Sequence, residues 1–564
     1  MRAVLFLLFS LVTTFIMFTE SNMQDVCPTK SPATVSPTDE WYAKMPYVDG
    51  GASTFYGGEL RTWAGKKIDV TSPIVDSKTQ QRAVIGSMAQ MTEVEALEVV
   101  ETAKSAWSGG QGAWPQMTAK ERVVALEGVI ESLLQRREEI INVLIWEICK
   151  NSADAAAEFD RTITFTKAMI QAYKEDANQA DWRTVSGVMA KVRRAAIGIV
   201  MCLGPFNYPI NETYATLLPA LLSGNVVILK VPTLGGLAHI LTIEAFQKHL
   251  PPGTLNFVSG SGRATMSPMM KTGAIDVLAF IGGSKAADAI IKDHPHPHRL
   301  NVFLQLEGKN PGIVLPDADL DSAVEQVTLG STSYNGQRCT AIKLVFVHRS
   351  IAEPFVKKLV ASIDALPVGL PWEENVKITP LPEPNKPGML RDWIEDAVAK
   401  GAKVVNDLAS SGGSGGTQEG ALCHPAVVYP VNADMRLWHE EQFGPVIPVA
   451  VFDDISEVQQ YVADSPYGQQ AAIFTQSTEQ GSDAAALTDT LSTIVGRINI
   501  NTQCARSPDV FPFSGRRSSA LGTMSMKDTV SLFSTETVVA TKKTDTNEAL
   551  TMGLDDSTRF LARM

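Results

Sequence analysis

The sequence lacks an excess of basic charge and contains no long low-complexity tract. Its 564 residues include 61 acidic and 49 basic side chains, which gives a formal net charge of -12. Because nucleic-acid binding depends on a basic surface, we expect no nucleic-acid partner. Hydrophobic residues make up 45% of the chain, so most of it is expected to fold, and its length allows two or three domains.

Cysteine is scarce, and the six that occur are far apart. They form no Cys-x-x-Cys pair and no other spacing typical of metal ligands, so we expect neither a metal site nor a dense disulfide framework. The thiols are expected to be mostly free, as in a reducing compartment such as the cytosol. The six are Cys27, Cys149, Cys202, Cys339, Cys423 and Cys504.

Long hydrophobic runs are missing except at the N-terminus. The apolar run 3–18 follows Arg2 and spans about 16 residues, which is short of the roughly 20 that a membrane-spanning helix needs. We expect residues 1–22 to be a signal peptide or a membrane anchor, unless translation starts at Met23. Such a segment favours a secretory route or plastid targeting and is the one expected membrane contact. The free thiols favour the cytosol, so the compartment stays open.

Three segments before the middle of the chain show the apolar spacing of amphipathic helices. They cover residues 92–107, 118–151 and 152–179. Thr118 and Glu121 are spaced as a capping box at the start of the second segment. The third segment is expected to carry Glu158 and Arg161 on its polar face.

The middle of the chain alternates apolar strands with stretches long enough for crossover helices. This rhythm predicts a parallel sheet that binds a ligand at the carboxyl ends of its strands. The expected strands cover residues 196–203, 225–230, 254–258 and 277–281.

These patterns suggest how the chain divides. We expect a polar leader over 23–41, a first α/β block over 42–308, a second α/β block over 309–500, and a C-terminal segment over 501–564. In the last segment, the β-branched residues 537–539 predict a strand that pairs across subunits. The Ser- and Gly-rich tract 410–416 is expected to be a surface loop.

Four motifs occur in a fixed order along the chain. Their joint order and spacing resemble the aldehyde dehydrogenase superfamily, over roughly residues 42–544. The resemblance implies an α/β fold with a Rossmann-type dinucleotide-binding domain over 42–308 and an α/β catalytic domain over 309–500. It also implies a β oligomerisation arm, formed in part near 180–197 and in part by the C-terminal segment, in a homodimer or homotetramer. The motifs are Gly-Pro-Phe-Asn-Tyr-Pro at 204–209, Asn-Val-Val-Ile-Leu-Lys-Val-Pro-Thr at 225–233, Asn-Gly-Gln-Arg-Cys-Thr at 335–340 and Glu-Gln-Phe-Gly-Pro-Val at 441–446.

The resemblance assigns the chemistry to Cys339 and Asn207. A thiolate adds to an aldehyde carbon and divides a difficult oxidation into hydride loss and thioester hydrolysis. Cys339 is therefore the predicted nucleophile, rather than one more small buried hydrophobe. Asn207 is the predicted oxyanion donor together with the backbone N–H of Cys339, although a turn-forming Asn is the alternative.

The resemblance also implies a nicotinamide dinucleotide. Lys230 is expected at the adenosine ribose, Gly283 near the cofactor, and Glu441 and Phe443 at the nicotinamide ribose. In relatives that prefer NAD a glutamate often occupies the position of Thr233, where it binds the ribose 2′-hydroxyl. A neutral Thr233 leaves room for a 2′-phosphate, so NADP is expected, with NAD as the alternative.

Within the superfamily, three phrases look like the non-phosphorylating glyceraldehyde-3-phosphate dehydrogenases, which oxidise glyceraldehyde 3-phosphate to 3-phosphoglycerate with NADP. They are Gly-Gln-Arg-Cys-Thr-Ala-Ile-Lys at 336–343, Ile-Thr-Pro at 378–380 and Ala-Arg-Ser-Pro-Asp-Val-Phe-Pro-Phe at 505–513. The positions that match the subfamily's phosphate-binding residues are Arg161, Tyr208, Arg338 and Arg506. Guanidinium groups suit a phosphate because they form bidentate, charge-assisted bonds, although each arginine alone has the commoner fate of a surface salt bridge.

One position departs from the superfamily pattern. The general base is usually the glutamate of Glu-Leu-Gly-Gly-Lys, but this chain has Gln305-Leu-Glu307-Gly-Lys. A carboxamide cannot accept a proton near neutral pH. In an extended segment, residues two apart point to the same face, so Glu307 is a hypothetical displaced base, with a solvent-exposed turn residue as its alternative and Glu441 as second choice.

This departure keeps rival functions open. Relatives without the glutamate can transfer the acyl group to coenzyme A, so an acylating dehydrogenase is one alternative. A different aldehyde, such as a semialdehyde, is a second, and a non-catalytic dehydrogenase-like protein that binds nucleotide is a third. In all enzymatic readings the partner is a small-molecule aldehyde.

Overall fold

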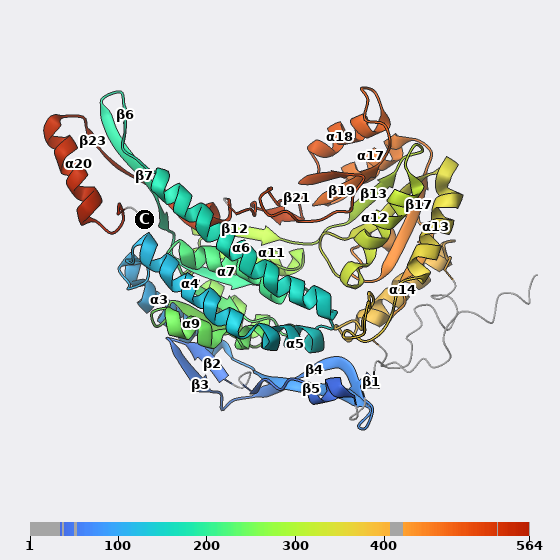
Figure 1. The fold of residues 1–564 in the computed structure, drawn as a ribbon, viewed down its shortest axis with the longest axis horizontal. Helices are drawn as coiled ribbons and strands as arrows, with labels where there is room; N and C mark the ends of the chain where they lie inside the picture. Colours follow the sequence, from blue (N-terminus) through green and yellow to red (C-terminus); the bar gives the residue numbers. More distant parts are fainter. Residues whose placement is uncertain (1–33, 36–38, 50–52, 407–420, 527, 563–564) are drawn as a thin grey trace, which may run out of the picture.

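Two parallel sheets organise the molecule, and a segment of extended chain joins them (Figure 1). The computed structural model describes residues 34–35, 39–49, 53–406, 421–526 and 528–562. The predicted signal or anchor segment and the Ser- and Gly-rich tract lie outside these residues. In the described parts of the chain, no helix has both the length and the apolar character needed to cross a membrane.

The first sheet has the strand order β10-β9-β8-β11-β12-β22, with β22 antiparallel to β12 and the other neighbours parallel. The chain builds outwards from β8 to β10 and then returns to the other side of β8, so the topological switch point lies between β8 and β11. The four predicted strands are confirmed, and β12 is added. The strands are β8 (Ile199–Leu203), β9 (Val226–Lys230), β10 (Leu255–Val258), β11 (Val277–Ile281), β12 (Asn301–Gln305) and β22 (Ala520–Leu521).

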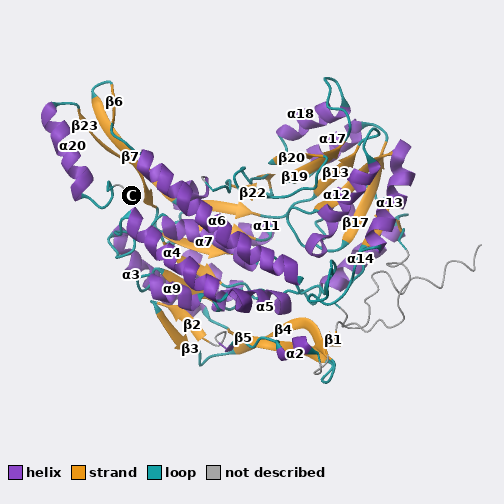
Figure 2. Cartoon of the chain, viewed as in Figure 1, coloured by secondary structure: helices purple, strands orange, loops and turns teal. Residues whose placement is uncertain are grey.

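Helices cover both faces of the first sheet because its strands are apolar on both sides. α3 and α10 pack on the face of Met201, whereas α4, α6, α7 and α9 pack on the face of Cys202 (Figure 2). Short helices α8 and α11 complete the crossovers. The bounds are α3 (Glu93–Trp107), α4 (Ala119–Gln135), α5 (Arg137–Glu147), α6 (Ser152–Gln179), α7 (Pro209–Leu222), α8 (Leu237–Ile240), α9 (Ile243–His249), α10 (Gly262–Lys271) and α11 (Ser284–Lys292).

The second sheet has the order β15-β16-β17-β14-β13-β19-β20, with β15 as its antiparallel edge. α12 and α13 cover one face, and α17 and α18 cover the other. The elements are β13 (Asn310–Val314), α12 (Leu320–Thr332), β14 (Ile342–His348), α13 (Ala352–Asp364), α14 (Lys386–Ala399), β15 (Lys403–Val404), β16 (Ala426–Tyr429), α16 (Arg436–His439), β17 (Val446–Phe452), α17 (Ile455–Asp464), β19 (Gln470–Phe474), α18 (Asp483–Ser492) and β20 (Arg497–Ile500).

An antiparallel arm extends from the first sheet, at the upper left of Figure 1. It consists of β6 (Arg183–Val185), β7 (Val188–Ala196) and β23 (Ser534–Lys542), followed by α20 (Asp545–Ser557). The predicted C-terminal strand is present, but it pairs over its whole length with β7 of the same chain, and its pairing across subunits stays a prediction. The N-terminal part adds the strand pair β4 (Lys67–Asp76) and β5 (Gln81–Ala89), the small strand β1 (Thr34–Val35), the helix α2 (Glu40–Ala43) and the hairpin β2 (Ser53–Tyr56) and β3 (Glu59–Thr62).

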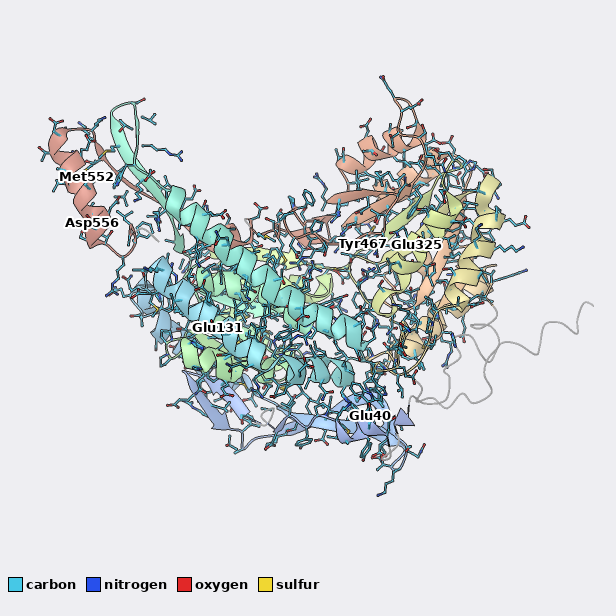
Figure 3. The ribbon with its side chains drawn as sticks, viewed as in Figure 1. Glu40, Glu131, Glu325, Tyr467, Met552 and Asp556 are labelled. Atoms are coloured by element: carbon cyan, nitrogen blue, oxygen red, sulfur yellow. The ribbon has the colours of Figure 1, made fainter. Side chains whose placement is uncertain are left out.

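The two sheets meet where the C-terminal segment runs between them. β18 (Tyr467–Gly468) pairs with β21 (Arg516–Arg517), and β22 then joins the first sheet beside Gln305. Tyr467 is labelled at this junction in Figure 3. The predicted boundary at 308/309 lies in the loop between β12 and β13, and the domain division stays a prediction. The helix α19 (Asp528–Leu532) leads on to the arm.

Candidate active site

Cys339 follows a tight left-handed turn that explains the Asn-Gly pair of its motif. Tyr334, Asn335 and Gly336 all have positive φ values of 48°, 57° and 70°. Side-chain bonds hold the turn, because Asn335 Oδ1 accepts from the Thr379 backbone N–H at 2.9 Å. A Cβ at Gly336 would lie 2.6 Å from the Ser331 carbonyl oxygen, so only glycine fits there.

The surroundings of the Cys339 thiol oppose its ionisation. Burial raises its pKa, and the Glu212 carboxylate raises the pKa further because a nearby negative charge opposes thiolate formation. Lys343 and the Gln469 side chain act in the opposite direction. Cys339 retains partial exposure, whereas Cys149, Cys202 and Cys504 are buried. Among these thiols, Cys339 is the accessible one.

Asn207 faces the nucleophile turn from the first sheet. It lies in the loop between β8 and α7, is 5% exposed, and donates from Nδ2 to the Gln337 carbonyl oxygen at 2.7 Å. An amide nitrogen carries two hydrogens, so this bond fixes the side chain and leaves the second N–H available for another acceptor. The arrangement suits the predicted oxyanion donor, and the role itself stays a prediction.

A buried ion pair that sequence reasoning missed holds this loop in place. Lys150 and Glu158 have no exposed side-chain area and form a salt bridge. Lys150 Nζ donates to the Asn207 carbonyl oxygen at 2.8 Å, and Glu158 Oε1 accepts from the backbone N–H of Ile210 at 3.0 Å. The expectation that Glu158 lies on a polar face is wrong, because its carboxylate caps the N-terminus of α7. The signal in the sequence was a lysine embedded in an apolar run at 140–150.

The predicted cofactor residues surround the carboxyl ends of β8, β9 and β11. Lys230 ends β9, is 7% exposed, and donates to the Val231 carbonyl oxygen at 2.6 Å. Burial lowers the pKa of Lys230 to about 8. Thr233 is exposed three residues further on, and Gly283 is the N-cap of α11. A buried ammonium with one carbonyl acceptor has donors to spare, which fits the phosphate of a dinucleotide.

Glu441 and Phe443 face this edge from the second sheet. Glu441 Oε1 pairs with Lys343 Nζ at 2.7 Å and accepts from the Gly308 backbone N–H at 3.2 Å. The ring of Phe443 packs edge-on against Phe206, with ring centroids 6.0 Å apart. Phe206 precedes Asn207, so the contact links the two sheets at the predicted nicotinamide end of the site.

The predicted substrate arginines form a connected cluster. Asp509 bridges two of them, because it binds Arg161 Nη2 at 2.8 Å and Arg506 Nε at 3.1 Å. Arg506 Nη1 also pairs with Glu212 at 2.7 Å, and Glu212 is the carboxylate that raises the pKa of Cys339. The cluster therefore lies within electrostatic range of the nucleophile.

Arg338 and Tyr208 complete the cluster. Arg338 Nη2 donates to the Gly330 carbonyl oxygen and to Gln503, each at 3.1 Å, while its buried Nε–H has no acceptor in the described part of the chain. Burial raises the pKa of Tyr208, and Arg338 and Arg161 act against this rise. Asp509 and Glu212 pair with Arg161 and Arg506, whereas Arg338 has no carboxylate partner among the described residues, which leaves one positive charge for an anionic ligand.

Gln305 and Glu307 occupy different environments. Gln305 is 2% exposed, and neither Nε2 nor Oε1 has a hydrogen-bond partner among the described residues. Glu307 is half-buried, and its two oxygens accept from the Ser284 backbone N–H at 2.9 and 2.8 Å. The carboxylate therefore sits on the N-terminus of α11, rather than pointing freely into solvent. Its role as a base stays a prediction.

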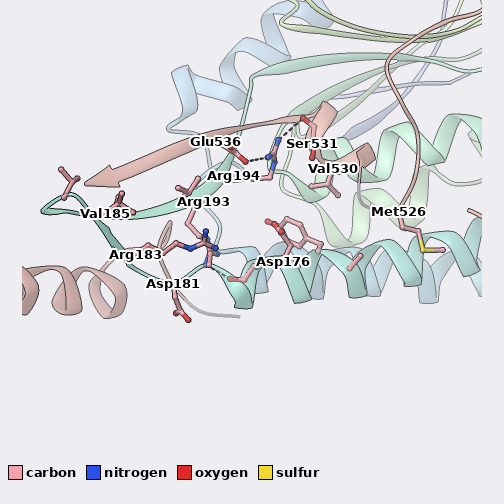
Figure 4. Close-up of a pocket in the computed structure, with 17 residues that line it drawn as sticks. Asp176, Asp181, Arg183, Val185, Arg193, Arg194, Met526, Val530, Ser531 and Glu536 are labelled. Carbon is pink, nitrogen blue, oxygen red and sulfur yellow. Dashed lines mark hydrogen bonds and ion pairs between the residues drawn. The ribbon is translucent and has the colours of Figure 1, made fainter. Parts of the chain in front are cut away.

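A separate cavity of about 640 Å³ lies beside the arm (Figure 4). It is lined by α6, β6, β7 and residues between Met526 and Glu536, and Arg194 bonds Glu536, its neighbour on the paired strands β7 and β23, at 3.0 Å. None of the predicted catalytic, cofactor or substrate residues lines it. This cavity is therefore distinct from the site around Cys339.

The site combines a thiol that follows a left-handed turn with an amide that faces it, where the ends of two α/β sheets meet and a dinucleotide would bind. This arrangement is that of an NAD(P)-dependent aldehyde-oxidising enzyme. The chain belongs to the aldehyde dehydrogenase family, whose pattern it matches over residues 63–539. The predicted family and fold class are confirmed.

Individual relatives narrow the comparison. The chain is 34% identical to an NADP-dependent glyceraldehyde-3-phosphate dehydrogenase of Streptococcus equinus, over 80% of this chain and 92% of that protein. A crystal structure of the enzyme of that name from Bacillus halodurans, complexed with NADP, is similar with a TM-score of 0.78 and 31% identity, covering 87% of this chain and 99% of that one. A 3-sulfolactaldehyde dehydrogenase of Priestia aryabhattai is 28% identical, over 83% of this chain and 93% of that protein.

Proposed function

We propose that the chain oxidises D-glyceraldehyde 3-phosphate to 3-phosphoglycerate with NADP⁺, without inorganic phosphate. The choice of a phosphorylated substrate rests on one observation, the cluster of Arg161, Arg338 and Arg506 beside the nucleophile. Arg338 has a buried N–H that is unpaired among the described residues. Guanidinium groups recognise a phosphate through several charge-assisted bonds at once. Two relatives, 34% and 31% identical to this chain, are named NADP-dependent glyceraldehyde-3-phosphate dehydrogenases.

NADP is supported by two features of the cofactor edge. Lys230 offers a buried ammonium, and Thr233 places no carboxylate where a 2′-phosphate would lie. When bound, the dinucleotide accepts a hydride. The chain's own residues then have to hold it, with Glu441 and Phe443 at the nicotinamide end.

Cys339 and Asn207 perform the first half of the reaction. The Cys339 thiolate adds to the aldehyde carbon, and the carbonyl electron pair moves to oxygen. The second N–H of Asn207 and the Cys339 backbone N–H stabilise that oxyanion. A dinucleotide held by Lys230, Glu441 and Phe443 would take up the hydride that this carbon loses, and the acyl group would remain on Cys339 as a thioester. Water then adds to the thioester, and the thiolate leaves as the carboxylate product forms.

Thioester hydrolysis is the slow step in this proposal. The attacking water must lose a proton, which Gln305 cannot accept. Glu307 is the hypothetical base, and it can act only after it leaves the Ser284 N–H, where both its oxygens are engaged. Glu441 is paired with Lys343, so Glu441 is the weaker candidate for the general base.

A sulfonate is the closest alternative to the phosphate group. The arginine cluster would also bind the sulfonate of 3-sulfolactaldehyde, the substrate in the name of the Priestia aryabhattai relative. A phosphate dianion carries more charge and so gains more from three guanidinium groups.

The proposal is tested by measuring the rate of NADPH formation by the full chain, followed by absorbance in buffer free of phosphate and coenzyme A. We expect sustained turnover of glyceraldehyde 3-phosphate with a kcat/KM at least tenfold above that of 3-sulfolactaldehyde. Arg506→Leu should raise KM for the phosphorylated aldehyde and leave the rate with an uncharged aldehyde similar. A preference for the sulfonate, or turnover only with coenzyme A, would replace the proposal with that alternative.

A further inference from the structure

Gln469 is a buried amide at the junction of the two sheets. It lies between β18 and β19 and is 1% exposed. Its Nε2 has no hydrogen-bond acceptor of ordinary geometry in the described chain. Leaving an amide N–H unpaired inside a protein destabilises the fold. The unpaired Gln469 amide therefore directs attention to the groups that it faces.

Asn310 ties Gln469 to the backbone of the nucleophile. Asn310 Nδ2 donates to the Cys339 carbonyl oxygen at 2.8 Å and to Gln469 Oε1 at 3.4 Å. Asn310 Oδ1 accepts from the Gln470 backbone N–H at 3.1 Å, so both ends of Asn310 are fixed. Because the oxygen end of the Gln469 amide is held by Asn310, its nitrogen end is directed away from Asn310.

Packing brings Gln469 against the Cys339 residue. A Cβ at Gly308 would lie 3.3 Å from the Cys339 carbonyl oxygen and 3.3 Å from Gln469 Cβ, so both groups cover the same glycine. Lys343 donates to the Cys339 carbonyl oxygen at 3.0 Å, and its charge is offset by Glu441. Burial raises the pKa of the Cys339 thiol, and the Gln469 side chain, whose Nε2 is unpaired among the described residues, acts against that rise.

We propose that Gln469 is a catalytic residue whose side-chain N–H donates to Cys339 Sγ and stabilises the thiolate. The proposal rests on Cys339 being the nucleophile of the proposed function. A half-buried thiolate has lost part of its hydration, and a neutral amide donor replaces a water that the site excludes. After acylation the sulfur is no longer charged, and the same N–H is free to bond the water that attacks the thioester.

The test is the pH dependence of Cys339 alkylation by iodoacetamide, which needs neither aldehyde nor NADP. A hydrogen bond to a charged group is worth about 1.5–3 kcal/mol, or one to two pKa units. In Gln469→Leu we therefore expect the alkylation midpoint to rise by about one to two pH units and the rate at pH 7.5 to fall about 10- to 100-fold. Mass spectrometry identifies Cys339 as the modified thiol.

Two further variants separate this role from a structural one. Gln469→Glu has the same size and adds a negative charge, so it should raise the midpoint at least as much as Gln469→Leu. Gln459→Leu, on α17, removes a partly buried amide that bonds Thr490 and should leave the midpoint unchanged. Wild-type midpoints in folded Gln469→Leu or Gln469→Glu would overturn the proposal. Absence of aldehyde oxidation with shifted midpoints would overturn only the proposed function.

Discussion

Lys230 gives the cofactor site a pH dependence near neutrality. The pKa of its ammonium is lowered to about 8 in the free protein, and a bound phosphate would raise that pKa because it stabilises the charged form. Binding below pH 8 therefore finds Lys230 already charged. Above pH 8 a proton must be taken up, so we expect the NADP affinity to fall about tenfold per pH unit, as measured by calorimetry from pH 6.5 to 9.5.

Lys230→Arg is the matched control for this dependence. An arginine stays charged over the whole range, so the affinity of the variant should be nearly independent of pH. The same slope in both proteins would mean that another group titrates, and that Lys230 does not contact the phosphate.

Gln305 defines the second prediction at the residue scale. Gln305→Glu places a carboxylate in a buried position, where its pKa rises towards neutrality and makes it an effective base. We expect the steady-state rate of NADPH formation to rise about 10- to 100-fold, and any initial burst to disappear. Stopped-flow absorbance measures both. An unchanged steady-state rate would show that proton removal from water is not limiting.

The motifs predicted the residues around Cys339 but not what holds them. Cys339, Asn207 and the arginines could be assigned because each lies in a short pattern of recognisable spacing. Lys150 and Asn310 could not, because their partners, Asn207 and Gln469, lie far away in the sequence. Such pairings depend on tertiary packing between distant segments, which the local spacing of residues does not reveal.

At the scale of elements, we expect the Glu307 carboxylate and a phosphate of the dinucleotide to compete for the N-terminus of α11. The Glu307 carboxylate occupies its N–H groups, and α11 follows the strand at the switch point, where doubly wound sheets bind the phosphates of dinucleotides. We expect Glu307→Gln to bind NADP about two- to fivefold more tightly, because a carboxylate at a helix N-terminus is worth about 0.3–1 kcal/mol. Fluorescence titration measures the Kd.

Turnover of the same variant decides the second role of Glu307. If Glu307 is the base, the variant keeps a burst of NADPH and loses steady-state turnover. Glu353→Gln, in the first turn of α13 and exposed, removes the same charge elsewhere and should change neither. Weaker NADP binding in Glu307→Gln would contradict a competition between the Glu307 carboxylate and the NADP phosphate for the N-terminus of α11.

Element boundaries followed the sequence except where tertiary contacts intervened. The segment 118–151 is two helices, α4 and α5, because the backbone turns at Arg136, whose guanidinium donates to the Leu241 carbonyl oxygen at 2.8 Å. The first predicted strand begins at Ile199, since Ala196 belongs to β7 in the arm. The capping box of Thr118 and Glu121 is local, and it is confirmed.

At the scale of the whole molecule, the site exists only when both domains are docked. Asn207 and Phe206 come from the first sheet, while Gln337 and Phe443 come from the second. Substrate and dinucleotide would therefore bind between two bodies that can shift relative to each other.

The arm presents an apolar surface that the described chain leaves uncovered. Val185, Val188, Val192 and Val538 are between 43% and 71% exposed, and Val192 lies directly opposite Val538 in the pairing of β7 with β23. Exposed apolar strands at the edge of a sheet favour association with another chain. We expect a homo-oligomer that uses this face, in agreement with the family's oligomerisation arm.

Light scattering after size-exclusion chromatography tests this assembly. Val538→Asp places a charge on the face and should convert the oligomer to smaller species, or lower its association constant at least tenfold. Val94→Asp is the control, because Val94 is 64% exposed in the first turn of α3, where an aspartate is well tolerated. A monomeric parent protein would contradict the predicted oligomer. An assembly that Val538→Asp leaves intact but Val94→Asp disrupts would place the interface away from the arm.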